Sequence, residues 1–224
     1  MNPKFPSVAI IIPAFNEASS IYDTVRAAAV YGKVVVVNDN SKDSTAALAI
    51  NAGAVVVNQK TNMGYDQALN SGFAAVASNG IEWAITFDAD GQHPADAIPK
   101  FVEEFEKGAQ LVVGVRPSYQ RLAEMFFSFY TRIRFGVRDP LCGMKGYSLG
   151  FYRELGQFDS VNSTGTEMMI RMCLSRVRLS QVKISINDRA DAPRFGWGWS
   201  ANKRILKSLF AVIAIDLRSI WNSV

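Results

Sequence analysis

Five short runs rich in β-branched residues alternate with helix-like segments in the first half of the chain, and this alternation limits the fold more than any other feature. The runs lie at residues 8–12, 33–37, 54–57, 83–87 and 111–115. Parallel strands need long crossover connections and are buried on both faces. The sequence therefore predicts an α/β fold with a mostly parallel, Rossmann-like central sheet and helices on both faces.

Two of the segments between these runs have apolar residues at the spacing of one helix face. The residues are Leu69, Phe73 and Val76 before the fourth run, and Ile98, Phe101, Val102 and Phe105 after it. We expect both segments to be helices that cover the sheet.

The composition narrows the class of protein. Hydrophobic residues make up 49% and charged residues 20% of the 224 residues, which is typical of a packed globular domain and excludes a disordered chain. A net charge of +4 favours an anionic partner. The basic residues are dispersed, which argues against nucleic acid. With two distant cysteines and no signal sequence, we expect a cytoplasmic protein.

The second half of the chain is less regular. We expect helices at about 120–135 and 165–178, a strand at 182–186 and a final amphipathic helix at 203–221. An apolar stripe marks the first of these helices: Leu122, Met125, Phe126, Phe129 and Ile133. Core packing and contact with a membrane surface both explain such a stripe beside arginines, and the choice stays open.

Polar residues follow each predicted strand. In open α/β sheets, ligands bind beyond the carboxyl ends of the strands, so these residues are the candidate site. They are Asn16 and Glu17, then Asn38 and Asp39, then residues 58–62 including Asn62, then Asp88 and Asp90, and finally Arg116.

Asp88 and Asp90 are the sharpest signal in this set. In extended backbone they point to the same side, where two carboxylates can share one cation, and Gln92 continues the alternation. Such oxygen ligands favour Mg²⁺ or Mn²⁺, which complete their shells with substrate phosphates. The alternative is a solvated turn after a strand.

Other members of the set have simpler explanations beside the functional ones. Glu17 can reach a ribose hydroxyl or cap the helix that follows. Asp39 can accept a hydrogen bond from a nucleobase or belong to a turn. Asp43 and Ser44 are expected to be turn and cap residues only.

Five motifs in order resemble the inverting glycosyltransferases of family two: PAFNE at 13–17, VVNDNSKDST at 36–45, NMGYDQALNSGF at 62–73, FDADGQH at 87–93 and GVR at 114–116. The later RDPLCGMKGY and DRADAPRFG segments are similar to the polyprenyl-phosphate sugar transferase branch, which includes dolichyl-phosphate mannose synthase. The resemblance implies a GT-A nucleotide-binding fold.

The resemblance also implies roles for individual residues. Pro13, Phe15, Glu17, Asp39 and Asn62 would bind the nucleoside part of a UDP- or GDP-linked sugar. Asp88, Asp90 and Gln92 would surround the metal ion, Arg116 would meet the donor phosphate, and Arg189 or Arg194 would meet a donor or acceptor phosphate. Asp139 lies where members with hydroxyl acceptors are thought to keep a base. Residues 1–118 would bind the donor and 119–200 the acceptor, with a terminal helix at 201–224.

This chain departs from the family pattern at three positions, namely Asn38, Asn40 and Asp66. Asn38 replaces an aspartate, whereas Asn40 and Asp66 stand where glycines are common. Asn40 still tolerates a left-handed turn. Asp66 is expected to reshape or recharge the donor pocket.

The resemblance leaves the acceptor open. A polyprenyl phosphate or another lipid-linked acceptor would place the enzyme on the inner face of a membrane, and a phosphate needs little base catalysis. A sugar or protein hydroxyl would need a carboxylate such as Asp139 or Glu167. A nucleotide-binding module without catalysis is the remaining alternative.

Overall fold

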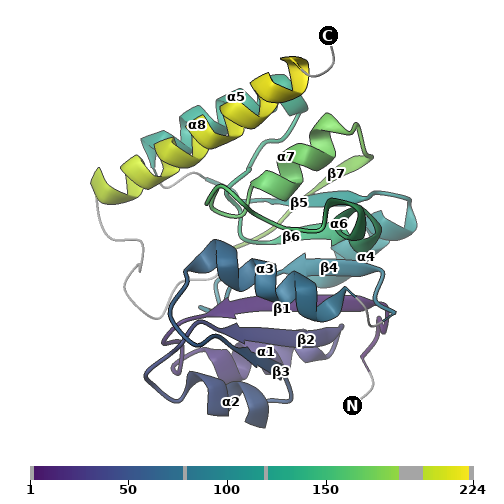
Figure 1. Cartoon of the computed structure of the whole chain (residues 1–224). Coiled ribbons are helices and arrows are strands. Elements are labelled where there is room, and N and C mark those ends of the chain that lie inside the picture. Colours follow the sequence, from purple (N-terminus) through teal and green to yellow (C-terminus); the bar gives the residue numbers. More distant parts are fainter. Residues whose placement is uncertain (1–2, 78–79, 119–120, 187–198, 222–224) are drawn as a thin grey trace.

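The computed structural model describes residues 3–77, 80–118, 121–186 and 199–221. In this part of the chain one sheet has seven strands, in the order β3-β2-β1-β4-β6-β5-β7 (Figure 1). The strands are β1 (Val8–Ala14), β2 (Lys33–Asn38), β3 (Val55–Asn58), β4 (Trp83–Thr86), β5 (Leu111–Val115), β6 (Lys145–Ser148) and β7 (Leu179–Lys183).

Helices connect the strands and cover both faces of the sheet. They are α1 (Ile21–Ala29), α2 (Thr45–Asn51), α3 (Tyr65–Val76), the 3₁₀ turn η1 (Ala95–Ala97), α4 (Ile98–Glu106), α5 (Leu122–Phe135), α6 (Leu149–Leu155), α7 (Glu167–Leu174) and α8 (Trp199–Trp221). The predicted α/β fold with a mostly parallel sheet is confirmed.

The alternation of side chains along β1 divides the core into two layers. Val8, Ile10 and Ile12 face α1, α2 and α4, whereas Ala9 and Ile11 face α3 and the later helices. The predicted stripes of α3 and α4 are buried in these two layers. Their burial fixes the sheet between the helices, with the strand ends free to form a site.

β6 was not predicted, and it makes the sheet mixed. It lies between β4 and β5 and pairs antiparallel with both, whereas the remaining pairs are parallel. Its sequence, KGYS, is short and contains a glycine, so no strand pattern stands out. The pairing brings the segment before β6 against the end of β4, where Asp88 lies.

The later elements also differ from their predicted bounds. β7 begins three residues before the predicted strand at 182–186, because Leu179–Lys183 pairs in register with Leu111–Val115 of β5. Helix α7 is shorter than predicted, and α8 begins at Trp199 rather than at residue 203.

Helices α5 and α8 lie side by side at one end of the molecule (Figure 1). Asp216 of α8 joins them, because its carboxylate accepts hydrogen bonds from Tyr130 Oη at 2.7 Å and from Arg134 Nε at 2.8 Å. The inner face of α5 carries Ala123 and Phe127, which pack in the core.

The apolar stripe of α5 faces outward. Its exposed fractions are 70% for Leu122, 52% for Met125, 65% for Phe126, 66% for Phe129 and 71% for Ile133. Core packing is therefore the wrong explanation for this stripe within the described part of the chain. None of the described helices has both the length and the apolar character that spanning a bilayer requires.

Candidate functional site

The loops after β1 and β2 hold each other through amide groups. The backbone N–H of Asn16 donates to Ser41 Oγ at 2.9 Å, and Lys42 N–H donates to Asn16 Oδ1 at 2.8 Å. Asn16 and Asn40 both have left-handed backbone, with φ of 54° and 60°, which asparagine tolerates. The prediction that Asn40 supports a left-handed turn is confirmed.

Asp39 organises the loop that leads into α3. Its carboxylate accepts the backbone N–H groups of Met63 at 2.7 Å and Gly64 at 2.8 Å. Asn38 next to it donates to Asn58 Oδ1 at 2.8 Å. The side chain of Asp39 therefore stabilises a turn, which is one of the two roles considered for it. It also lines the cavity described next.

A cavity of about 310 Å³ opens at the carboxyl ends of β1, β2 and β4. Eight residues were predicted to contact the nucleoside or to hold the metal, and all of them except Gln92 line this cavity. These lining residues are Pro13, Phe15, Glu17, Asp39, Asn62, Asp88 and Asp90. We call this the donor-side cavity.

A second cavity of about 160 Å³ adjoins the first. Gln92, Arg116, Arg121 and Glu124 line only this one, which we call the arginine cavity. Six residues line both cavities, namely Asp88, Asp90, Leu141, Gly143, Thr164 and Arg204. The aspartate pair thus lies where the two cavities meet.

Close backbone approach fixes the position of Asp88. A Cβ atom on Gly143 would lie 2.2 Å from Asp88 Oδ2, so only glycine leaves room for that carboxylate. Thr86 holds Gly143 in place by donating from Oγ1 to its carbonyl at 2.6 Å. The pairing of β4 with β6 therefore positions the side chain of Asp88 against Gly143.

His93 also contacts Asp88, a role that sequence analysis missed. Its Nδ1 accepts the backbone N–H of Asp88 at 3.2 Å, and its Nε2 lies 3.7 Å from Asp88 Oδ2. The ring is buried and packs edge-on against Phe87. Its place five residues after Asp88 in a turn gave no signal of this contact.

The donor atoms at the aspartate pair suit a hard cation that is only partly held by the protein. Among the described residues, no group of three or more His, Cys, Asp and Glu side chains forms a complete metal site. Asp88 and Asp90 with the Gln92 amide fit Mg²⁺ or Mn²⁺, because these ions commonly take their remaining ligands from water and substrate phosphate.

Arg116 and Asp139 are bound to each other. Asp139 is 1% exposed and accepts from Arg116 Nε and Nη2, each at 2.8 Å, while Arg116 Nη2 also donates to Glu124 Oε2 at 3.1 Å. Burial opposes the charge of Arg116, but the bonds to Asp139 outweigh it and raise the pKa of the guanidinium. Asp139 lies behind Arg116 and lines neither cavity.

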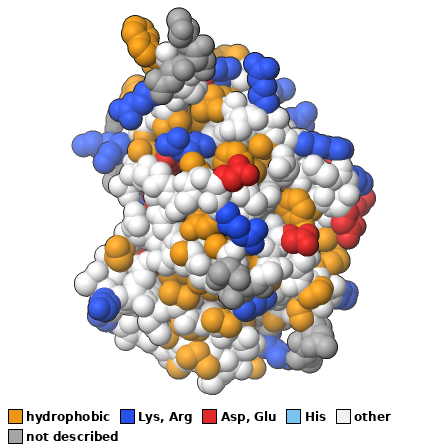
Figure 2. Space-filling model, turned by 45° about the vertical axis from the view of Figure 1, so that its right-hand side comes forward, with side chains coloured by type: hydrophobic (Ala, Val, Ile, Leu, Met, Phe, Trp, Pro, Cys, Tyr) orange, Lys and Arg blue, Asp and Glu red, His pale blue; other side chains and the backbone are white. Residues whose placement is uncertain are grey.

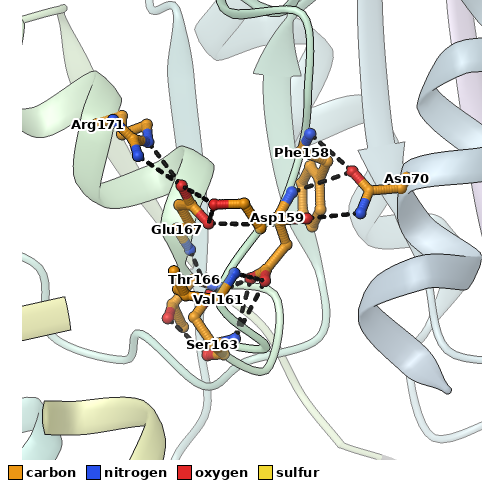
Figure 3. Close-up of polar contacts among 9 residues, drawn as sticks. Asn70, Phe158, Asp159, Val161, Ser163, Thr166, Glu167 and Arg171 are labelled. Atoms are coloured by element: carbon orange, nitrogen blue, oxygen red, sulfur yellow. Dashed lines mark hydrogen bonds and ion pairs between the residues drawn. The ribbon is translucent and has the colours of Figure 1, made fainter. Parts of the chain in front are cut away.

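Two other acids, Glu17 and Glu167, differ in their position relative to the cavities. Glu17 lines the donor-side cavity and accepts a hydrogen bond from Ser20 Oγ at 3.2 Å, just before α1. Glu167 is fully buried and accepts from Ser160 N–H at 2.6 Å and Arg171 Nε at 2.8 Å, within the network of Figure 3. It lines neither cavity.

Asp66 connects α3 to the loop before α7. Its carboxylate accepts the backbone N–H groups of Gly165 at 2.6 Å and Thr164 at 3.3 Å. Thr164 is left-handed, with φ of 58°, which is uncommon for a β-branched residue. Burial, and then the charge of Asp159, raise the pKa of Asp66 to about 6. Asp66 therefore shapes the cavity wall at Thr164 rather than lining it.

Three basic residues of the site were not predicted, and one of them is Arg121, which lines the arginine cavity. Lys145 at the start of β6 lines the donor-side cavity, and Arg204 of α8 lines both cavities. Burial lowers the pKa of Lys145, although Cys142, Asp139 and Asp88 oppose this effect. Arg121, Lys145 and Arg204 all lie outside the strand-end loops of the first half, where the search for site residues began. Arg189 and Arg194 lie outside the described residues.

Comparison with known proteins places this geometry in a family. Residues 9–161 match the family described as glycosyl transferase family 2. The undecaprenyl-phosphate mannosyltransferase of Micrococcus luteus is 28% identical over 194 residues, which cover 78% of this chain and 79% of that protein. The dolichyl-phosphate hexose transferase of Haloferax volcanii is 26% identical over 220 residues, covering 91% of this chain and 94% of that protein.

A solved structure shares the fold. Glucosyl-3-phosphoglycerate synthase from Mycobacterium tuberculosis, in complex with Mg²⁺ and uridine diphosphate, has a TM-score of 0.71 and 19% identity. The match covers 92% of this chain and 78% of that one. Since the family match extends over more than half of the sequence, the chain belongs to glycosyl transferase family 2 and is a glycosyltransferase with the GT-A fold.

Proposed function

We propose that this glycosyltransferase moves a sugar from a nucleoside-diphosphate sugar to a polyprenyl phosphate or lipid-linked acceptor at a membrane surface, with inversion at the sugar. One observation carries the proposal. The carboxylates considered as bases, Asp139 and Glu167, are each engaged by an arginine and line neither cavity, whereas the arginine cavity holds Arg116, Arg121 and Arg204.

That arrangement favours an acceptor that is already anionic. A hydroxyl acceptor has to lose a proton to a positioned base, but a phosphate oxygen attacks without one. Arginines are suited to hold such a phosphate. The relatives from Micrococcus luteus and Haloferax volcanii, which are named for polyprenyl-phosphate and dolichyl-phosphate transfer, support the same acceptor class.

On the donor side, the loops after the strands would hold the nucleoside and the aspartate pair would face the diphosphate. Asp88, Asp90 and Gln92 would hold Mg²⁺ or Mn²⁺, which would stabilise the negative charge that develops on the leaving diphosphate. Basic residues in the two cavities would stabilise the same negative charge. Among them, Arg204 lines both cavities.

The reaction is a substitution at the anomeric carbon. The bond from that carbon to the diphosphate oxygen breaks, and the nucleoside diphosphate leaves with the electron pair. A phosphate oxygen of the acceptor forms the new bond from the opposite face. No group is oxidised or reduced, and the site has to align two anions and shield their charge.

The α5–α8 face, defined as the exposed side chains of these two helices, supports a membrane location. The stripe of α5 continues on α8 with Phe210, Leu217 and Trp221, which are 67%, 60% and 84% exposed. The two acids of these helices, Glu124 and Asp216, are buried. Their exposed charges are therefore all basic: Arg132, Arg134, Lys203, Arg204, Lys207 and Arg218.

Exposed aromatic and aliphatic side chains beside basic ones are typical of a helix face that lies on an anionic bilayer. The upper end of Figure 2 shows basic side chains next to hydrophobic ones. A soluble acceptor is the second candidate, because the structural relative is glucosyl-3-phosphoglycerate synthase. The exposed apolar face favours the lipid over a soluble anion.

The test supplies purified protein and Mn²⁺ with uridine- and guanosine-diphosphate sugars. It offers two acceptors, polyprenyl phosphate in anionic vesicles and 3-phosphoglycerate in solution. We expect a lipid-linked sugar phosphodiester whose formation stops when the metal is chelated and when Asp88→Ala replaces the wild type. Transfer to 3-phosphoglycerate with no lipid product would overturn the proposed acceptor.

A further inference from the structure

Lys145 is a buried lysine on β6, the strand between β4 and β5. It is the first residue of β6, opposite Thr86 of β4 and Val113 of β5, and it is 3% exposed. Its backbone N–H donates to Thr86 Oγ1 at 3.1 Å, two residues before Asp88. The backbone is therefore held firmly while the side chain extends toward the donor-side cavity that it lines.

The ammonium group has fewer partners than it has donors. Its Nζ donates to the carbonyl oxygen of Gly165 at 3.2 Å. In the part of the chain that the structure describes, this is the one hydrogen bond of the ammonium, and no carboxylate forms an ion pair with it. An ammonium has three N–H donors, so donors remain for a partner that enters the cavity.

A buried ammonium without a direct ion-pair partner is costly. Asp88 and Asp139 act on Lys145 only from beyond ion-pair distance, so an anion that enters the cavity can supply the missing contact. The arginines nearby differ in this respect, since Arg116 and Arg121 already have carboxylate partners. Lys145 shares the donor-side cavity with Asp88, which points to a ligand that carries negative charge close to the aspartate pair.

We propose that the ammonium of Lys145 binds a phosphate oxyanion, either of the donor diphosphate or of the acceptor phosphate. The inference rests on the proposed function for the identity of the ligand. Its chemistry is the same for both sources: a tetrahedral oxyanion accepts the free N–H donors and neutralises the buried charge. A purely structural lysine would only hold the Gly165 carbonyl in place.

The experiment compares wild type with Lys145→Met, which keeps the side-chain length and removes the charge, and with Lys145→Gln, which keeps a donor for Gly165. Lys183→Met is the matched control, because Lys183 of β7 is exposed and its loss changes the net charge equally. Titration calorimetry with uridine and guanosine diphosphates, with Mn²⁺, measures the donor arm. Initial rates against polyprenyl phosphate in vesicles measure the acceptor arm.

We expect both Lys145 variants to melt no lower than wild type without ligand, since they remove a buried amino group that has no ion-pair partner among the described residues. For both variants, either the Kd for nucleoside diphosphate or the KM for polyprenyl phosphate should rise about tenfold to a hundredfold, as expected when a charge-assisted hydrogen bond is lost. A change in nucleotide affinity assigns Lys145 to the donor, whereas a change confined to the acceptor KM assigns it to the acceptor. Lys183→Met should behave as wild type.

The inference is overturned if wild type binds nucleotide while both variants stay within twofold of it in both arms. It is also overturned if Lys145→Gln keeps wild-type behaviour and Lys145→Met alone loses affinity and melting temperature, because Lys145 would then act only through Gly165. Failure of wild type to bind any nucleoside diphosphate would instead reject the proposed function.

Discussion

The two sides of the site are held together by different interactions. The loops after β1 and β2 are fixed by side-chain hydrogen bonds to backbone N–H groups, such as those of Asp39 and Asn16. The region from Arg116 to α8 is fixed by ion pairs with buried carboxylates, such as Arg116–Asp139 and Arg134–Asp216.

The difference indicates how each side tolerates change. A turn that rests on several hydrogen bonds loses about 1 kcal/mol with each bond. A buried ion pair that loses one partner leaves an uncompensated charge and loses several times more. The donor side should therefore be the more tolerant one, except where the two sides meet at Asp88.

The largest effect is expected for Arg116→Met. The substitution removes the ion pair of the buried Asp139, which keeps the backbone N–H of residue 116 as a donor, and it removes one partner of Glu124. The free energy of unfolding should therefore fall by about 3 to 5 kcal/mol. Urea denaturation measures it. The exposed Arg132→Met should change stability by no more than about 0.5 kcal/mol. The double variant Arg116→Met with Asp139→Leu should regain part of the lost unfolding free energy. If Arg116→Met is as stable as wild type, the contrast between the ion-paired side and the hydrogen-bonded side of the site is wrong.

The second largest effect concerns Asp66, and it should appear as a change of the unfolding free energy with pH. Its pKa in the folded protein is about 6, above the value of about 3.9 in an unfolded chain. Between these values the folded state keeps the proton and the unfolded state releases it, so the stability contributed by Asp66 declines as pH rises from 4 to 6. The total is about 3 kcal/mol.

Asp66→Asn has no proton to lose at this position. The difference in unfolding free energy between wild type and this variant should therefore change between pH 4 and 6 and be constant above pH 7. A difference that does not vary with pH would show that Asp66 shifts no proton equilibrium on folding.

Gly143→Ala tests Asp88, the residue at which the donor side and the ion-paired side of the site meet. The added Cβ would lie 2.2 Å from Asp88 Oδ2 and must displace it. Displacement of a reacting group by about 1 Å costs about a hundredfold in rate. We expect kcat to fall by that factor while the melting temperature changes little. Gly150→Ala, whose added Cβ would meet Ser148 Oγ at 3.3 Å, serves as the control. Wild-type turnover by Gly143→Ala would contradict the proposed dependence of the Asp88 position on Gly143.

The smallest effect concerns the outer surface. Phe126 and Phe129 are exposed, so Phe126→Glu with Phe129→Glu should leave the fold intact and weaken binding to anionic vesicles about tenfold or more. Vesicle sedimentation measures it. Ile50→Glu, on the exposed side of α2 at 56% exposure, is the matched control. Equal sedimentation of all three proteins would show that the α5–α8 face does not contact lipid.

Sequence analysis was most successful where each residue's role depends on its neighbours along the chain. Asp88 and Asp90 follow a buried strand, and Asp39 follows another, so their meeting at one sheet edge could be predicted. Lys145 and His93 could not be found in this way. Lys145 reaches the cavity only because β6 inserts between β4 and β5, and His93 turns back onto the strand end that precedes it.

The sequence by itself determined the α/β fold, the strand-end location of the site and the amphipathic character of α5, because these follow from local periodicity. The tertiary structure alone decided that the stripe of α5 faces outward, that Asp139 is held by Arg116, and that Gly143 seats Asp88. Periodicity shows that a helix has two faces, but which face is covered depends on partners that are distant in the chain. The same holds for charges, since burial and pairing are properties of the assembled fold.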